Sequence, residues 1–158
     1  MKVTGRIESR LAEKGIHIPE AAAPAANYVP YIVSDRLVFV SGQVTMENGA
    51  IRYQGKVGED FTVAEAQQAA RLCALNLISQ LRAACGGDLD RVWRVVRLGG
   101  FVNSAPGFTE QHLVINGASD LMVEVFGAAG RHARAAVGVS ELPFGVAVEV
   151  DGVFELTP

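Results

Sequence analysis

The sequence predicts an α+β fold in which two main helices pack on one face of a single β-sheet. The length of 158 residues fits one domain. Short strand-like runs rich in valine alternate with two long stretches in which apolar residues recur at helical spacing. The resulting order of strand, hairpin, helix, strand, helix, strand and strand is typical of a sheet that carries its helices on one side.

The N-terminal segment predicts a short helix followed by an extended arm. Residues 6–14 can form the helix, and Gly15 can end it in the left-handed conformation. Residues 19–31 contain three prolines and no helical periodicity, which argues against a second helix. Because the arm is rich in alanine and carries two tyrosines, we expect it to lie on the protein surface.

The next segments predict a strand, a hairpin and the first long helix. Residues 36–41 form the strand, and Asn48-Gly49 suits the type I′ turn of a short hairpin. Thr62 and Glu65 have the spacing of a capping box, which marks the start of the helix. Its predicted buried stripe consists of Ala66, Ala69, Ala70, Cys73, Leu77, Leu81 and Ala84.

The second half of the chain predicts a strand, a helix and two further strands. Residues 92–102 form a long strand, in which Gly99-Gly100 indicates a bulge or a close approach of another segment. Residues 110–126 form the second helix. Residues 134–139 and 146–155 form the last two strands.

Alternation along the last two strands predicts which side chains share a face. Glu149 and Asp151 lie opposite the valines of their strand. We expect Arg134 on the same face as Glu149, with Val137 under the helices. A face that mixes charged, small and apolar residues suits a subunit interface, so we expect an oligomer.

Composition and charge exclude several classes of protein. A net charge of −3 and the absence of any Lys/Arg run argue against a nucleic-acid partner. No apolar stretch reaches the roughly 18 residues of a membrane span, and the N-terminus lacks the apolar block of a signal peptide. Cys73 and Cys85 would lie about 18 Å apart along one helix, too far for a disulfide. We therefore expect a reduced, cytoplasmic protein that needs no metal or organic cofactor.

Two charged residues in the last strands are candidates for chemistry. Arg134 could hold a carboxylate through two parallel hydrogen bonds, although an ordinary interface arginine would have the same pattern. Glu149 could act as an acid or base or orient water, although it could equally be an ion-pair partner. Asn116 lies within a predicted helix, where we favour a tertiary contact over a ligand contact. His132 is expected to be a solvated loop histidine.

Five segments in order along the chain resemble the RidA/YjgF family, the Rid-type imine and enamine deaminases. They are Pro30-Tyr31, VFVSGQV, VVRLGGFV, Ile115-Asn116-Gly117 and HARAAVGVSELPFGVAVEVDGVFE. The last is the most specific, because it joins an A-R-x-x-V pattern, a Leu-Pro pair and a glutamate-bearing strand at the family's spacing. The resemblance runs from about Pro24 to Phe154. Residues 1–23 are therefore interpreted as an N-terminal extension, and residues 24–158 as the RidA/YjgF-like domain.

The resemblance implies a mixed sheet of the chorismate-mutase-like type and a homotrimer with clefts between neighbouring subunits. It also implies hydrolysis of reactive 2-imino or 2-enamino acids to 2-keto acids and ammonia. By position, Arg134 matches the carboxylate-binding arginine and Glu149 the glutamate that positions water. The positions that line the family's cleft are matched by Tyr31, Ser41, Gly42, Asn116 and Ala136.

One departure from the family pattern bears on the ligand. Ala136 stands where many members have a cysteine, and Ala135 and Gly138 also differ from the common residues. We expect the pocket near Arg134 to be wider or more apolar as a result.

Two other functions stay open at this stage. A trimer that binds small carboxylates without catalysis would keep Arg134 and tolerate the changes around it. An endoribonuclease activity, ascribed to some relatives, fits the acidic charge less well.

Overall fold

A computed structural model of the protein describes residues 5–24 and 26–158, and it contains a five-stranded sheet in the order β1-β2-β7-β5-β6. The strands of this sheet are β1 (Tyr31–Ser34), β2 (Leu37–Gln43), β5 (Val92–Asn103), β6 (Ala133–Val139) and β7 (Val148–Leu156). A separate hairpin pairs β3 (Met46–Glu47) with β4 (Ala50–Ile51). The helices are α1 (Arg6–Lys14), α2 (Val63–Ala84) and α3 (Gln111–Phe126), and the short 3-10 turns are η1 (Leu89–Arg91), η2 (Gly127–Gly130) and η3 (Pro143–Gly145).

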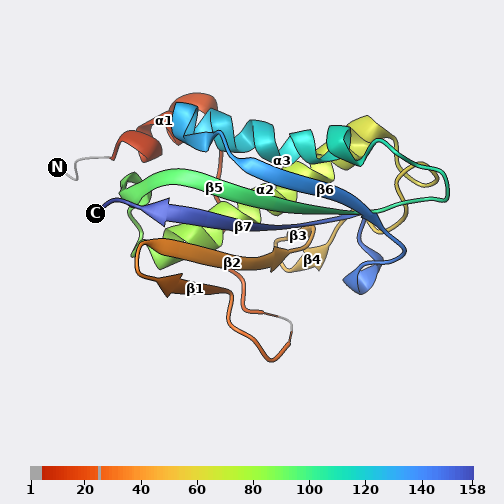
Figure 1. Ribbon diagram of the computed structural model, residues 1–158, viewed down its shortest axis with the longest axis horizontal. Coiled ribbons are helices and arrows are strands. Elements are labelled where there is room, and N and C mark those ends of the chain that lie inside the picture. The colour runs from red at the N-terminus through yellow and green to blue at the C-terminus, as the bar shows by residue number, and fades with distance from the viewer. Residues whose placement is uncertain (1–4, 25) are drawn as a thin grey trace.

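The sheet is mixed, and its connections place both long helices on one face. β7 pairs antiparallel with β2 and with β5, whereas β5 and β6 are parallel. Helix α2 connects β2 to β5, and α3 connects β5 to β6. Such crossovers have a fixed hand, so two of them in one direction cover the same side of a sheet. Figure 1 shows α2 behind the sheet and α3 along its β6 edge, which confirms the predicted α+β fold.

The N-terminal segment packs onto this domain instead of extending into solvent. Ile7 and Leu11 of α1 are buried in the same apolar cluster as the sheet and helices. Beyond Gly15, which has the left-handed φ of +63°, the arm runs along α2. The Ser79 hydroxyl donates to the Pro19 carbonyl at 2.8 Å, and the Gln80 amide donates to the Ala22 carbonyl at 2.7 Å. The arm therefore lies on a surface, as expected; residues 1–4 and 25 of the predicted extension and arm lie outside the described residues.

The structure confirms two predictions that depend only on residues close together in the sequence, a helix cap and a turn. Thr62 and Glu65 form a complete capping box at the start of α2. Asn48 and Gly49 have φ values of 52° and 78°, as a type I′ turn requires. The strand β1 was not predicted, because its four residues follow Pro30 and are too few to show alternation.

The helices and the sheet approach each other closely at glycines. A Cβ on Gly100 would lie 2.5 Å from Cγ1 of Ile115 on α3, so the Gly99-Gly100 pair marks a close approach. The bulges of β5 lie elsewhere, between Val92 and Arg97. A Cβ on Gly117 would lie 2.0 Å from the backbone oxygen of Gln67, where α2 and α3 cross. These contacts let α3 lie close to β5 and to α2.

Helix α3 is a core helix. The segment Gln111–Gly130 is long and apolar enough to cross a membrane, but the buried core helices of folded domains have the same length and composition. The apolar residues of α3, such as Ile115 and Leu121, are buried against α2 and the sheet.

The predicted faces are right for β7 and wrong for β6. Glu149 is half-buried on the side of the sheet away from the helices, as expected, and it lies opposite Phe101. Phe101 in turn lies opposite Val137, which is 46% exposed on this open face. Arg134 instead lies opposite Leu98, which is buried under the helices.

Close packing by α3 explains the error. A Cβ on Gly138 would lie 2.7 Å from Nε2 of Gln111, the first residue of α3. The helix side of β6 thus carries the small residues Ala136 and Gly138 together with Arg134, which extends along the exposed side of α3, and the larger valines turn outward. Hydrophobicity alone assigns these two faces the wrong way round.

Candidate functional site

Arg134 lies at the edge of the sheet, against the exposed side of α3. Its Nη1 donates to Oδ1 of Asn116 at 2.9 Å and to Oγ of Ser119 at 3.0 Å, and its Nη2 donates to the His112 carbonyl at 2.7 Å. Asn116 therefore makes the tertiary contact that we favoured. Within the described residues these bonds use three of the five N–H donors of the guanidinium, which leaves two for a carboxylate. Ala136 follows two residues along the strand and packs against the core.

A chain of hydrogen bonds behind Arg134 includes His132. Its Nδ1 lies 2.6 Å from the Gly130 carbonyl oxygen, which can only accept, so Nδ1 carries a proton. In a neutral ring Nε2 then accepts from the Ser119 hydroxyl, 2.8 Å away, and the Ser119 oxygen accepts from Arg134. His132 therefore lies in a loop, as expected, but it is half-buried and both ring nitrogens are hydrogen-bonded instead of solvated. Sequence reasoning also missed Ser119, because no local pattern links it to a strand 15 residues later.

Glu149 lies on the open face in a different environment. Burial raises the pKa of its carboxyl group above the ordinary value, and the negative charge of Asp151 raises it further. A Cβ on Gly42 would lie only 2.6 Å from Oε1 of Glu149, so a larger residue at the end of β2 would displace the carboxylate. Gly42 and Glu149 are therefore brought together from separate strands.

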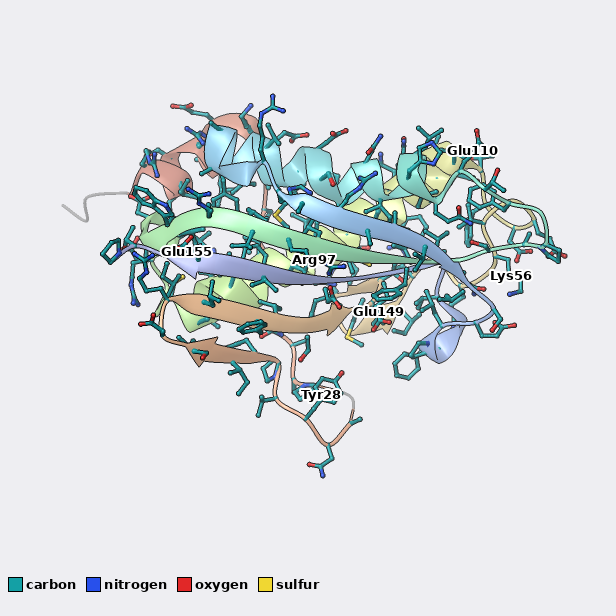
Figure 2. All side chains as sticks on the ribbon, viewed as in Figure 1. Tyr28, Lys56, Arg97, Glu110, Glu149 and Glu155 are labelled. Atoms are coloured by element: carbon teal, nitrogen blue, oxygen red, sulfur yellow. The ribbon has the colours of Figure 1, made fainter. Side chains whose placement is uncertain are left out.

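A large cavity adjoins Glu149 and Gly42. Its volume is about 680 Å³, and its walls come from the N-terminal arm, the end of β2, the β3–β4 hairpin, α2 and η3. Figure 2 shows Glu149 near the end of β2 and Tyr28 on the arm below it. This volume lies in the range of small-molecule sites. No sequence pattern predicted the cavity, because its walls come from segments far apart along the chain.

Two of the predicted cleft residues, Tyr31 and Ser41, lie close to this cavity without lining it. Tyr31 pairs with Val40 and packs at the edge of the core, on the helix side. The Ser41 hydroxyl donates to the Val29 carbonyl at 2.8 Å, which holds the arm against β2. In one chain, Arg134 and Asn116 thus form one group on the helix side of the sheet, whereas Glu149 and Gly42 form another on the open face.

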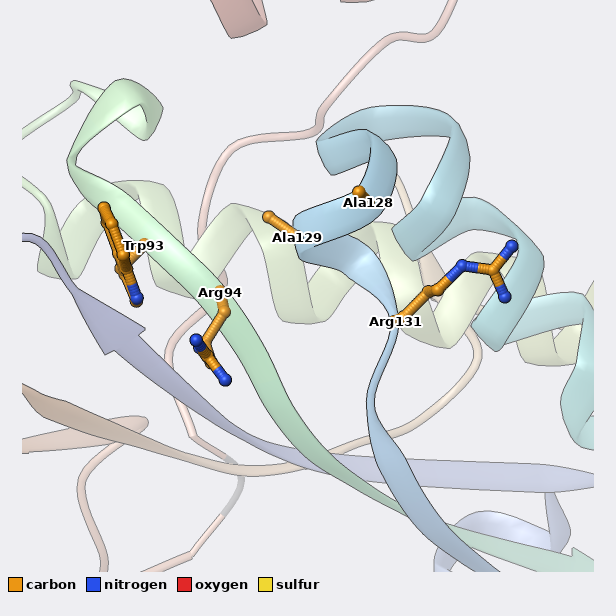
Figure 3. A pocket seen from close by; sticks show the side chains of 5 residues that line it. All are labelled: Trp93, Arg94, Ala128, Ala129 and Arg131. Carbon is orange, nitrogen blue, oxygen red and sulfur yellow. The ribbon is translucent and has the colours of Figure 1, made fainter.

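A second, smaller cavity has a different character. It encloses about 280 Å³ between β5 and η2, and Trp93, Arg94 and Arg131 line it. Arg94 is engaged by Glu155, with Nε and Oε2 3.6 Å apart, and Figure 3 shows the Arg131 guanidinium directed away from Trp93 and Arg94. Its polar groups do not converge on one point, so we assign it no ligand.

Other reactive side chains are unsuited to nucleophilic chemistry. Cys73 is fully buried, and burial raises the pKa of its thiol far above the ordinary value. Burial also raises the pKa of Cys85 to about 11. Both thiols therefore stay protonated at neutral pH. Among residues 5–24 and 26–158, no group of three or more His, Cys, Asp or Glu side chains could hold a metal ion.

The fold and the two groups of residues define a class: a small α+β protein of the YjgF type. The model of the family described as "YjgF/chorismate_mutase-like, putative endoribonuclease" matches residues 8–151. The chain belongs to this family.

Three similar proteins match nearly the whole chain. Protein TCP17 of Trypanosoma cruzi is 55% identical over 154 residues, which cover 97% of this chain and 96% of that protein. The crystal structure of Atu1372 from Agrobacterium tumefaciens, described as of unknown function, is 54% identical with a TM-score of 0.89, and the match covers 96% and 92% of the two chains. The crystal structure of a "putative endoribonuclease" from Shewanella oneidensis is 39% identical with a TM-score of 0.92, covering 96% of this chain and all of that one.

Proposed function

We propose that this protein hydrolyses reactive 2-imino or 2-enamino acids to 2-keto acids and ammonia, in a cleft between two copies of the chain. The observation that carries the proposal is a carboxylate of raised pKa beside a ligand-sized cavity, at the position of the family's water-positioning glutamate. Membership of the YjgF family supports the fold that positions these residues. The surroundings of Arg134 and Glu149 support carboxylate binding and proton transfer, respectively.

The proposed role of Arg134 is to hold the substrate carboxylate. Asn116 and Ser119 fix its guanidinium, so little side-chain entropy is lost when a ligand binds. Its two remaining N–H donors can bind a carboxylate by charge-assisted hydrogen bonds. A fixed carboxylate places the adjacent imine carbon in a defined position, which is the main requirement of an already electrophilic substrate.

The proposed role of Glu149 is to accept a proton from the attacking water. The water oxygen bonds to the imine carbon, the electron pair of the C=N bond moves to nitrogen, and Glu149 takes the water proton. Glu149 then returns this proton to nitrogen, which gives a neutral carbinolamine. As the C–N bond breaks, the hydroxyl proton passes through Glu149 to the nitrogen, ammonia leaves, and the C=O bond of the keto acid forms. A carboxyl group with a raised pKa suits both steps, because its pKa lies closer to the working pH.

Two copies of the chain are needed to complete such a site. Arg134 and Glu149 lie on opposite faces of one sheet, so one chain cannot aim both at one small substrate. The open face also exposes Ile32, Phe39 and Val137, by 54%, 45% and 46%. Apolar groups gathered on a face favour burial against a partner. A homotrimer is the closed assembly that the family resemblance implies.

The endoribonuclease description of the family is the competing function. Binding of RNA depends on positive charge that neutralises phosphates. The cavity beside Gly42 is instead lined by two carboxylates, Glu20 and Glu149, and the net charge of the chain is −3. These charges oppose a polyanion at this site.

The direct test generates several 2-imino acids in situ with an amino-acid oxidase and adds the purified protein. We expect it to accelerate the disappearance of the imine, and Glu149→Gln to abolish most of the acceleration. A protein that leaves every imine at its spontaneous rate, while it cleaves RNA, would contradict the proposal and support the competing one.

A further inference from the structure

The cavity beside Glu149 extends well beyond the space that the reacting atoms need. We propose that it is a side-chain subsite, built partly by the N-terminal arm, which selects 2-imino and 2-enamino acids with an aromatic or long aliphatic side chain. This inference rests on the proposed function and adds the substrate class. The cavity of about 680 Å³ begins at Glu149 and Gly42, where the imine carbon would lie, and ends against the arm.

The arm residues are held in place by α2. Ser79 and Gln80 donate to the carbonyls of Pro19 and Ala22, and Arg82 donates to the carbonyl of Ile18 at 3.2 Å. Ile18 is itself buried in the core. The arm is thus a fixed wall of the cavity, although it contributes no strand or helix there.

These hydrogen bonds also remove polar groups from the cavity wall. The amides of Gln80 and Asn76 are engaged, since Asn76 donates to the carbonyls of Val44 and Met46 at 3.1 and 2.9 Å. The wall that is left is largely apolar and includes Ala23, Tyr28 and Met46. Such a wall favours an apolar substituent over a polar one.

Phe144 adds an aromatic wall at the cost of a strained backbone. It has a φ of 60°, which is unfavourable for a bulky residue, and it is an exposed residue that lines the cavity. The Gln54 amide holds the turn by donating to the Phe144 carbonyl at 2.8 Å. Strain of this kind persists where the surrounding structure maintains it, and it is frequent at ligand sites. Stacking on a substrate ring is the role that this position suits.

The test compares imines generated from phenylalanine and from alanine, on wild type and on Ala23→Phe. Ala23→Phe places a benzyl group inside the cavity. Ala21→Phe is the matched control, because it adds the same bulk to the same exposed arm at a residue outside the cavity wall. A parallel measurement by calorimetry follows the binding of phenylpyruvate and pyruvate, which are stable 2-keto acids.

We expect wild type to favour the phenylalanine-derived imine in kcat/KM by at least about tenfold, since even one methylene in an apolar pocket is worth that much. Ala23→Phe should remove this preference by slowing only the larger substrate, and Ala21→Phe should leave it unchanged. Phe144→Ala should weaken the preference for the aromatic substrate, by lowering kcat/KM for the phenylalanine-derived imine more than for the alanine-derived imine. Equal rates for both imines in wild type, or an equal loss of both in Ala23→Phe, would overturn the subsite and leave the proposed function standing.

If no imine is hydrolysed, the proposed function fails and the binding measurement decides the subsite. Tighter binding of phenylpyruvate than of pyruvate, lost in Ala23→Phe and kept in Ala21→Phe, would preserve an aromatic side-chain site. Equal binding of the two keto acids would overturn it.

Discussion

Three hydrogen bonds fix the guanidinium of Arg134 before a ligand binds. Substitutions of Arg134 can therefore show whether binding needs only its positive charge or also the geometry of its donors. Arg134→Lys keeps the charge but cannot reproduce the planar set of donors. We expect both Arg134→Ala and Arg134→Lys to weaken binding of a 2-keto acid by at least about tenfold, because a charge-assisted hydrogen bond contributes about 1.5–3 kcal/mol. Calorimetry measures the affinity, and thermal unfolding checks that the fold is intact.

Arg131→Ala is the matched control for these two variants. Arg131 is an exposed arginine three residues earlier, and it does not contact the Asn116–Ser119 group in the described structure. Unchanged affinity in all three variants would remove Arg134 from the site.

Burial gives Glu149 a higher pKa than an exposed glutamate has. As pH falls, protonation of Glu149 should therefore lower the activity and raise the stability. As a base it must be deprotonated, so kcat/KM should fall with decreasing pH through a value above 4.5, the ordinary pKa of the side chain. Glu149→Gln should lower turnover by about 10²-fold or more and remove this limb of the profile. Keto-acid binding should change little, because Gln keeps the shape.

The same raised pKa affects stability. The folded state binds a proton more tightly than the unfolded state, so this stabilising contribution is full below the ordinary pKa and is lost as pH rises through the raised one. Glu149→Gln should therefore raise the midpoint of thermal unfolding at pH 7. A variant with wild-type turnover and a lowered midpoint would assign Glu149 a structural role.

At the scale of elements, the crossing of α2 and α3 depends on Gly117. Replacement of an exposed helical glycine by alanine usually stabilises a protein by about 0.5–1 kcal/mol. Here the new methyl would lie 2.0 Å from the Gln67 backbone oxygen, which cannot move without the helix. We expect Gly117→Ala to lower the free energy of unfolding by about 1–3 kcal/mol in urea titrations. A stabilised variant would show that the helices can separate without cost.

The elements also show which features a sequence can predict. The capping box of α2 and the Asn48-Gly49 turn were predicted because each depends on residues within one turn of the chain. The faces of β6 were predicted wrongly, because the choice between glycine and valine there depends on how closely α3 passes. The hydrogen bond between His132 and Ser119 could not be predicted either, since it joins two segments that meet only in the folded protein.

The candidate site was predictable in part. Arg134 and Glu149 stood out because charged residues interrupt apolar strands, and the family resemblance gave them roles. No sequence pattern could predict the cavity beside Glu149, because its walls form only when the arm, α2 and η3 come together in the folded chain. Phe144 carried no signal for the same reason, since its positive φ is a property of the folded turn.

At the scale of the whole molecule, the two groups of site residues face away from each other. The Arg134 group lies beside α3, and the Glu149 group lies on the open face with Phe101 and Val137. In a closed ring, each subunit can offer its Arg134 group to one neighbour and its Glu149 group to the other. Under the proposed function, each active site therefore exists only in the assembly.

Complementation between two inactive variants shows whether neighbouring subunits share one site. Arg134→Ala and Glu149→Gln are co-expressed with different tags, and mixed assemblies are isolated by sequential affinity steps. In a mixed assembly some clefts combine the intact Arg134 of one chain with the intact Glu149 of the other. In a mixed ring of three, whether it contains two copies of one variant or of the other, one of the three clefts is intact, so we expect imine hydrolysis at about a third of the wild-type rate. Mixed assemblies that are as inactive as either parent would contradict a site shared between subunits.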